Sequence, residues 1–354
     1  MTASEPLSPA EEPLPVPTGI VVGVDGSEQS DCAVVWAARE ARSRGLPLHL
    51  VTAYSVPVFA ASGLDGGYAT VDDDVIRESA KAMVGHAAAT AAPYSVELDA
   101  RVESGDAAAV LLEMSRTADT LVFGSRGRGG FVGRLLGSVS SALPAHAECP
   151  TVTVPLSCAP RLGQEPKHPA KDSARPEDVR AQVTVGVDGS ERARVAVLGA
   201  AEYAQRHALA LRVLCAVPPF NGSLAWMPAA VDHDSLFDEL RVQLAAGKAW
   251  LQSHFPQLPI STELLDAQPV EAMIQATRES ELVVMGTRGR GGFAGMLLGS
   301  TTDGVLHHAK GPVMVVHDAP DPRLDDRPAF GPMMTGGTEP PPAGPPAPGT
   351  RPPA

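Results

Sequence analysis

Two segments of this 354-residue chain occur twice at almost the same separation. Residues 23–28 read GVDGSE, and so do residues 186–191. Residues 124–138 read GSRGRGGFVGRLLGS and residues 286–300 read GTRGRGGFAGMLLGS, with twelve of the fifteen positions identical. The offsets are 163 and 162 residues, so the chain holds two copies of one domain of about 140 residues.

Composition divides the remainder of the chain. We predict domains over residues 19–155 and 182–317, because apolar periodicity is confined to these stretches. Residues 156–181 are rich in Pro, Lys, Arg and Asp and are predicted to be a linker. Residues 1–18 and 318–354 are predicted to be disordered, since their Pro-rich composition offers too little apolar surface to offset the entropy of ordering.

Strand and helix signals alternate in both copies. Short apolar runs predict strands at 19–24, 48–54, 96–102, 120–123 and 150–154, and at 183–187, 211–217, 260–265, 282–285 and 313–316. Helical spacing in the first copy predicts helices at 28–44, 71–92, 107–116 and 138–147. This alternation predicts an α/β fold, in which each copy is a five-stranded parallel sheet with helices on both faces.

Charge and cysteine content restrict the partners and the compartment. The net charge of −13 argues against a nucleic-acid partner, because phosphates and an acidic surface repel each other. The longest apolar runs fall far short of the ~20 residues that cross a bilayer, so we expect no membrane insertion. The N-terminus lacks the basic and apolar stretches of a secretory signal, and the four cysteines form no CxxC pair. We therefore expect reduced thiols, a cytoplasmic protein and no metal site.

A glycine-rich loop follows the fourth predicted strand of each copy with the spacing G-x2-G-x9-G-S. Glycines at such a place let the backbone take positive φ values and approach a ligand closely. Exposed N–H groups, the start of the next helix and the arginines of the loop then favour a phosphate. The spacing differs from both the Walker loop and the dinucleotide fingerprint. The repeated residues predict an anion site beyond the carboxyl ends of the strands.

One aspartate ends the first predicted strand of each copy, at Asp25 and at Asp188. Aspartate before glycine is typical of a turn in which the side chain accepts a backbone N–H. A carboxylate at this edge of the sheet is also suited to bonding a ribose or base, or to helping hold Mg²⁺ beside phosphates. The two interpretations are compatible, and both stay open at this point.

These motifs resemble those of tandem universal stress proteins of the ATP-binding branch, as found in mycobacteria and other actinobacteria. The resemblance rests on GVDGS, on GSRGRGG and GTRGRGG, on LLGS, and on the closing strands at 149–154 and 311–316. It implies the adenine-nucleotide alpha-hydrolase-like fold, ATP with Mg²⁺ as ligand, and a homodimer. In the first copy the implied ATP contacts are Gly23, Val24, Asp25, Val51, Gly124, Ser125, Arg126, Gly127, Arg128, Gly129, Gly130, Gly137, Ser138 and Val139. In the second copy they are Gly186, Val187, Asp188, Leu214, Gly286, Thr287, Arg288, Gly289, Arg290, Gly291, Gly292, Gly299, Ser300 and Thr301.

The resemblance further implies that adenine meets the backbone of Val51 or Leu214 and that the phosphates lie along the glycine loop. Two departures distinguish the second copy: Met296 stands for Arg134, and Ala267-Gln268 stands for Gly105-Asp106. We expect the first site to bind the nucleotide more tightly, since it keeps the extra cation.

The function expected on these grounds is that of a nucleotide-dependent regulator or sensor in stress, stationary-phase or hypoxic adaptation, with an unknown protein partner. No acid–base pair recurs beside the loops, so rapid catalysis is not expected and no residue is assigned a catalytic role. A slow ATPase and a structural, partner-binding stress protein are the alternatives. The apolar last strands, at 152–154 and 313–316, are expected to pair edge to edge and join the copies into a pseudo-dimer.

Overall fold

A computed structural model describes residues 18–55, 73–127, 136–165, 180–219, 233–289 and 297–325. The first copy comprises β1 (Ile20–Gly23), α1 (Glu28–Arg44), β2 (Leu48–Tyr54), α2 (Asp73–Ala91), the 3-10 helix η1 (Ala92–Tyr94), β3 (Leu98–Ser104), α3 (Ala107–Met114), β4 (Thr120–Gly124), α4 (Ser138–His146) and β5 (Thr151–Val154). The second comprises β6 (Arg180–Val187), α5 (Glu191–Arg206), β7 (Ala210–Val217), α6 (His233–His254), β8 (Ile260–Asp266), α7 (Pro269–Glu279), β9 (Ser280–Gly286), α8 (Ser300–His308) and β10 (Val313–Val316). The predicted order of elements is confirmed, with β3 beginning two residues later than expected.

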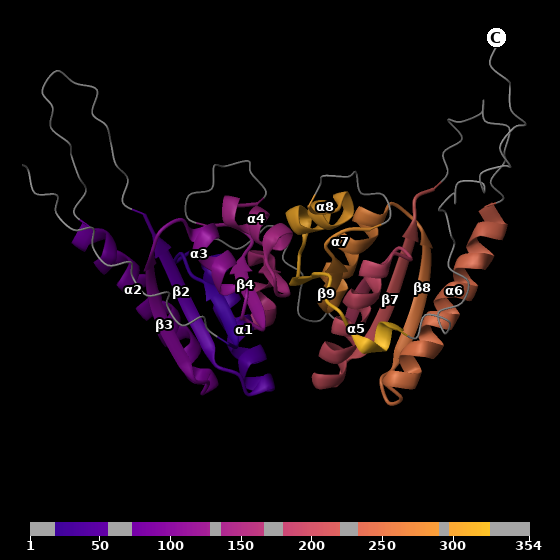
Figure 1. The fold of residues 1–354 in the computed structure, drawn as a ribbon, viewed down its shortest axis with the longest axis horizontal. Coiled ribbons are helices and arrows are strands. Elements are labelled where there is room, and N and C mark those ends of the chain that lie inside the picture. The colour runs from indigo at the N-terminus through magenta and orange to yellow at the C-terminus, as the bar shows by residue number, and fades with distance from the viewer. Residues whose placement is uncertain are drawn as a thin grey trace, which may run out of the picture.

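The strands form one continuous sheet in the order β3-β2-β1-β4-β5-β10-β9-β6-β7-β8. Neighbours within each copy are parallel, whereas β5 and β10 pair antiparallel, with Val152 opposite Met314. The predicted edge-to-edge pairing of the last strands is therefore confirmed. Figure 1 shows the result: α2 and α6 lie at the two outer ends, and α4 and α8 lie near the junction.

Helices cover both faces of the sheet, as the all-apolar strands predict. All five residues of β4 are buried, which is the pattern of a strand covered on both sides. The α1, α2, α5 and α6 helices share one hydrophobic core that continues across the junction. On the opposite face α3 and α4 pack over one cluster, and α7 and α8 pack over another. The predicted α/β class is confirmed.

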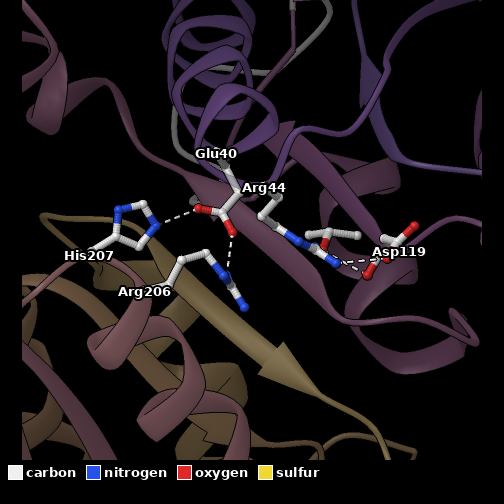
Figure 2. A network of polar contacts seen from close by, with 6 residues as sticks. Glu40, Arg44, Asp119, Arg206 and His207 are labelled. Carbon is white, nitrogen blue, oxygen red and sulfur yellow. Dashed lines mark hydrogen bonds and ion pairs between the residues drawn. The ribbon is translucent and has the colours of Figure 1, made fainter. Parts of the chain in front are cut away.

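A polar contact also joins α1 to the end of α5 (Figure 2). Glu40 is only 3% exposed, and its two carboxylate oxygens meet Arg206 at 2.9 Å and His207 at 2.7 Å. Within the first copy, Arg44 pairs with Asp119 at 2.7 Å. A buried carboxylate costs much free energy unless it is paired, so the Glu40 contact ties the two copies in one relative position.

The segment after β5 is more ordered than its composition predicts. Residues 156–165 belong to the predicted linker, yet Leu156–Leu162 forms a 3-10 helix, η2, in which Cys158 and Ala159 are fully buried. The Arg161 guanidinium donates to three carbonyl oxygens of the second copy, those of Thr277, Arg278 and Ser280. The beginning of the linker is therefore part of the junction.

The segment after β10 also differs from the expected disorder where the structure describes it. Residues 318–325 lead into a short 3-10 helix, η4 (Pro322–Asp325). Arg323 bonds the Glu202 carboxylate of α5 at 2.6 Å and lies over the Phe255 ring, 5.8 Å from its centroid. The rest of the predicted tail, residues 326–354, lies outside the described residues, as do 1–17.

Candidate functional site

A cavity of about 490 Å³ opens between the parallel strands β1 and β4, where the order in which successive strands join the sheet reverses. Such reversal points, beyond the carboxyl ends of parallel strands, are where α/β sheets bind ligands. Ten of the predicted residues line it: Gly23, Val24, Asp25, Val51, Gly124, Arg126, Gly127, Gly137, Ser138 and Val139. Ser125 instead bonds the end of β5, through its N–H to the Val154 carbonyl. Arg128, Gly129 and Gly130 lie outside the described residues.

The second copy repeats the arrangement around a cavity of about 190 Å³. It is lined by the equivalent residues, Gly186, Val187, Asp188, Leu214, Gly286, Arg288, Gly289, Gly299, Ser300 and Thr301. Thr287 bonds the end of β10 as Ser125 bonds β5. Arg290, Gly291 and Gly292 lie outside the described residues, as do Arg134 and Met296. The predicted residues therefore come together around a cavity in each copy, and the two cavities differ in size.

Asp25 serves a turn and faces the loop at the same time. Its Oδ1 atom accepts the Ser27 N–H at 3.0 Å, and Gly26 takes a positive φ of 71°. A Cβ placed on Gly127 would collide with Oδ2 of the same carboxylate. Asp188 and Gly289 repeat the geometry in the second copy. The turn interpretation of the aspartate is confirmed by one carboxylate oxygen, and the other oxygen lies against the glycine loop.

The loop glycines are required for close approach and not for positive φ. Gly124, Gly127 and Gly137 all have ordinary φ values, so the expected left-handed backbone is absent at these three positions. A Cβ on Gly124 would lie 2.7 Å from the Gln29 Cβ atom, in the first turn of α1. Gly124 thus lets β4 pack on α1, whereas Gly127 lets the loop backbone reach the carboxylate of Asp25.

The first turn of α4 lies at the cavity and has no side-chain cap. The Ser140 hydroxyl donates to the Gly124 carbonyl at 2.8 Å, and the Gly137 N–H donates to the Ser125 carbonyl at 3.3 Å. No side chain caps the helix, because the N-cap residue is Gly137. The first N–H groups of α4 therefore point to the cavity without a protein acceptor from the cap, which is the arrangement that binds phosphate. In α8, Thr302 donates to the Gly286 carbonyl at 2.9 Å in the same way.

At the larger cavity β2 continues past the end of β1, so backbone beyond Val51 faces the cavity as well. The β1–β2 register ends at the pair Gly23–Val51, and the Val51 carbonyl accepts the Val24 N–H at 2.8 Å. Backbone groups of alternate strand residues face the same side, so those of Ala53 extend past β1 into the cavity that it lines. Ala216 occupies the same place beyond the last β6–β7 pair. Sequence periodicity cannot locate the last paired residue of a strand, and this position was missed.

Ser30 is a second residue that the sequence prediction missed. Its side chain lines the larger cavity and is 2% exposed, and its hydroxyl has no hydrogen-bond partner among the described residues. Ala193 stands at the same place in the second cavity. A buried hydroxyl without a partner costs free energy, so its presence at a cavity wall is a mark of a ligand site.

The described residues offer little for covalent or metal chemistry. Within them, no group of three or more His, Cys, Asp or Glu side chains could hold a metal ion. Burial raises the pKa of the Cys32 and Cys149 thiols to about 12, so neither is a nucleophile near neutral pH. No helix in the described ranges has the length and apolar character needed to cross a membrane.

Comparison with known proteins assigns the family. The model of the universal stress protein family matches residues 18–155 and 180–317. The chain belongs to the universal stress protein family. The universal stress protein Rv2623 of Mycobacterium tuberculosis is 35% identical over 306 residues, covering 85% of this chain and 97% of the relative. The resemblance seen in the sequence is thus confirmed at the level of the family.

Solved structures agree on the fold of this universal stress protein. The crystal structure of a universal stress protein from Archaeoglobus fulgidus covers 85% of this chain and 96% of its own, with a TM-score of 0.57 and 19% identity. A universal stress protein solved in complex with cAMP covers 39% of this chain at 27% identity and a TM-score of 0.31. The first likeness extends across both copies and supports the tandem architecture.

Proposed function

We propose that this universal stress protein binds ATP at both crevices and acts as a nucleotide-dependent regulator in stress adaptation. The observation that carries the proposal is duplicated geometry. In each copy a glycine lets the loop backbone lie against an aspartate, beside a helix start that no side chain caps. A carboxylate and an anion site a few ångströms apart suit a ligand that has both hydroxyls and phosphates.

Different residues of the site would contact the phosphates, the ribose and the adenine. The phosphates would lie at the start of α4, along the N–H groups that follow Gly137 and beside Arg126. The ribose hydroxyls would donate to Asp25, and the adenine would lie on the apolar wall that contains Val51, bonding the backbone of Ala53. Mg²⁺ would be held mainly by the phosphates and water, and it would neutralise phosphate charge.

A regulator fits the lining better than a rapid enzyme. Asp25 is the only carboxylate among the described residues that line the larger cavity, and no lysine or histidine stands there. Fast phosphoryl transfer needs a group that orients the attacking nucleophile in addition to charge neutralisation. Slow ATP hydrolysis is the alternative. Phosphate release at saturating ATP and Mg²⁺ separates the two, because turnover above about 1 per second would favour an enzyme.

Titration of ATP into the purified chain by calorimetry tests the proposal. We expect two nucleotides per chain. Gly127→Ala should remove one and Gly289→Ala the other, because the added Cβ collides with Asp25 or Asp188. Gly85→Ala is the matched control, since a Cβ there meets nothing within 4 Å. A folded wild-type chain that binds no ATP contradicts the proposal.

The wider role also belongs to this proposal. We infer a cytoplasmic protein from its buried, reduced thiols, and a homodimer and a protein partner from the family resemblance. A pull-down with and without ATP tests the regulatory part. Partner recovery that changes with ATP supports a regulator, whereas recovery that is unaffected by ATP favours a structural stress protein.

A further inference from the structure

His317 connects the second copy to the helix that forms the first site. It is the residue that follows β10, and its Nε2–H donates to the Pro144 carbonyl of α4 at 3.0 Å, across 173 positions of sequence. The side chain is half-buried at the junction of the copies. A side chain of one domain thus holds the backbone of the other domain's site helix.

The Pro144 carbonyl, which accepts the bond from His317, receives no hydrogen bond from the N–H of Glu148. In a continuing helix the N–H four residues later, that of Glu148, would donate to the Pro144 carbonyl. Glu148 instead donates to the Ser115 hydroxyl at 3.0 Å. His317 therefore takes the place of a helical bond in the last turn of a nine-residue helix, whose first turn forms the wall of the larger cavity.

The same strand end also holds the loop of the second site. The Val316 carbonyl accepts the Thr287 N–H at 3.2 Å, and the Thr287 carbonyl accepts the N–H of Gly299, the N-cap of α8, at 2.7 Å. Residues 316 and 317 accordingly contact the loop of the second crevice through backbone and the helix of the first through a side chain.

The histidine contact has no counterpart at the residue that follows β5. In the first copy the Val154 carbonyl accepts the Ser125 N–H at 3.0 Å, as its counterpart does. The next residue is Pro155, which has neither a backbone N–H nor a side-chain donor. On the first-copy side, the residue that contacts backbone just beyond α8 is instead Ser157 of η2, whose hydroxyl donates to the Lys310 carbonyl at 3.1 Å.

On these contacts we propose that His317 is a positioning residue for the first nucleotide site and couples its affinity to occupancy of the second. The inference rests on the proposed function for the identity of the ligand. A ligand that draws the Thr287 loop toward the second crevice moves the end of β10, and His317 transmits that movement to α4. A net hydrogen bond of this kind corresponds to a two- to tenfold effect on affinity.

Calorimetry with ATP on His317→Leu, His317→Gln and the wild type tests the proposal, each with and without Gly289→Ala. We expect His317→Leu to weaken the first site two- to tenfold with the second site intact, and by less when Gly289→Ala has closed it. His317→Gln should restore the wild-type pattern, because glutamine can still donate to the Pro144 carbonyl. The matched control is His307→Leu, since the polar contacts of His307 with the described residues are those with Asp303 on its own helix.

An equal loss of affinity in both backgrounds, or no loss, would overturn the coupling. Amide hydrogen exchange in α4 supplies a readout that needs no nucleotide. Faster exchange of the last turn in His317→Leu, restored in His317→Gln, supports the positioning role even if ATP proves to be the wrong ligand. Unchanged exchange refutes that role independently of the proposed function.

Discussion

The Ser30 hydroxyl is expected to destabilise the folded protein when no ligand is bound. Its buried hydroxyl lacks a partner within the described ranges, and such a group costs about 1–3 kcal/mol. We therefore expect Ser30→Ala to raise the free energy of unfolding in the absence of nucleotide by about 1 kcal/mol. Denaturant titration measures the change, with Ser79→Ala on exposed α2 as control for helix propensity. A destabilised Ser30→Ala protein would show that the hydroxyl is satisfied.

His317 should make stability depend on pH. Burial lowers the pKa of its imidazole, and this outweighs the carbonyls of Pro144 and Cys149 and the charge of Asp318, which favour protonation. The unfolded chain then binds a proton more readily than the folded one below pH 6.5, so stability is lost as pH falls through that region. Unfolding of wild type and His317→Gln at pH 7.5 and 5.5 measures it. The wild type should lose more stability, and equal losses would contradict the prediction.

Single positions show where sequence reasoning reaches its limit. Asp25 and Gly127 were predictable, because a repeated motif fixes which residues meet at the crevice. The reason for Gly127 was not, since close approach to a carboxylate depends on where a neighbouring loop lies. Ala53 was missed for a related reason: hydrophobic pattern identifies a strand but does not reveal where its neighbour ends.

At the scale of elements, η2 stabilises the junction between the two copies. The Arg161 guanidinium bonds three carbonyls near the end of α7, and a Cβ on Gly311 would touch it. Its removal leaves those carbonyls without their charged donor. We expect Arg161→Ala to cost about 3 kcal/mol of unfolding free energy, near the upper end for hydrogen bonds to charged groups.

Thermal unfolding of Arg161→Ala provides the measurement. The control is Arg241→Ala, because the Arg241 side chain is 63% exposed and its contacts with Asp238 and with the Phe237 ring both lie within α6. That control should cost less than about 0.5 kcal/mol. Equal effects of the two substitutions would mean that η2 contributes nothing special to the junction.

Composition explains why η2 was predicted as a linker. Its apolar residues lack a helical or strand period and are followed by a stretch rich in Pro, Lys and Asp, so no pattern marks them as buried. They pack against α1 of the first copy, whose Arg39 guanidinium donates to the Leu162 carbonyl at 3.0 Å. Cys158 and Ala159 are fully buried in the core to which α1 contributes, and no sequence period indicates that burial.

At the scale of the whole molecule, the repeat predicted both the fold and the junction. Two similar copies with apolar last strands cover each other's open edges by pairing them, and the ten-stranded sheet is the outcome. Symmetry at this level does not extend to the cavities. Met273 and Met285 stand where the first copy has Leu111 and Phe123, and side-chain volume of this kind is invisible to a motif.

The two crevices should therefore differ in affinity. The cavity of about 190 Å³ is smaller than the range usual for small-molecule sites, about 300–1,000 Å³, whereas the cavity of about 490 Å³ falls within it. Met273 lines the smaller cavity at the place where Leu111 lines the larger one. Each side chain lies close to the glycine of the first strand of its copy, with Met273 3.0 Å from a Cβ placed on Gly186 and Leu111 2.8 Å from one placed on Gly23. The difference between the sites therefore lies in the volume of the cavities and not in this contact.

We expect the first site to bind ATP about fivefold more tightly, equivalent to about 1 kcal/mol. Calorimetry on Gly289→Ala reports the first site alone, and Gly127→Ala reports the second. Met273→Ala should then strengthen the second site and leave the first unchanged, because the methionine that narrows the cavity is removed. Equal affinities in the two single-site variants, or a second site weakened by Met273→Ala, would show that cavity size does not set the order and that Met273 contacts the nucleotide.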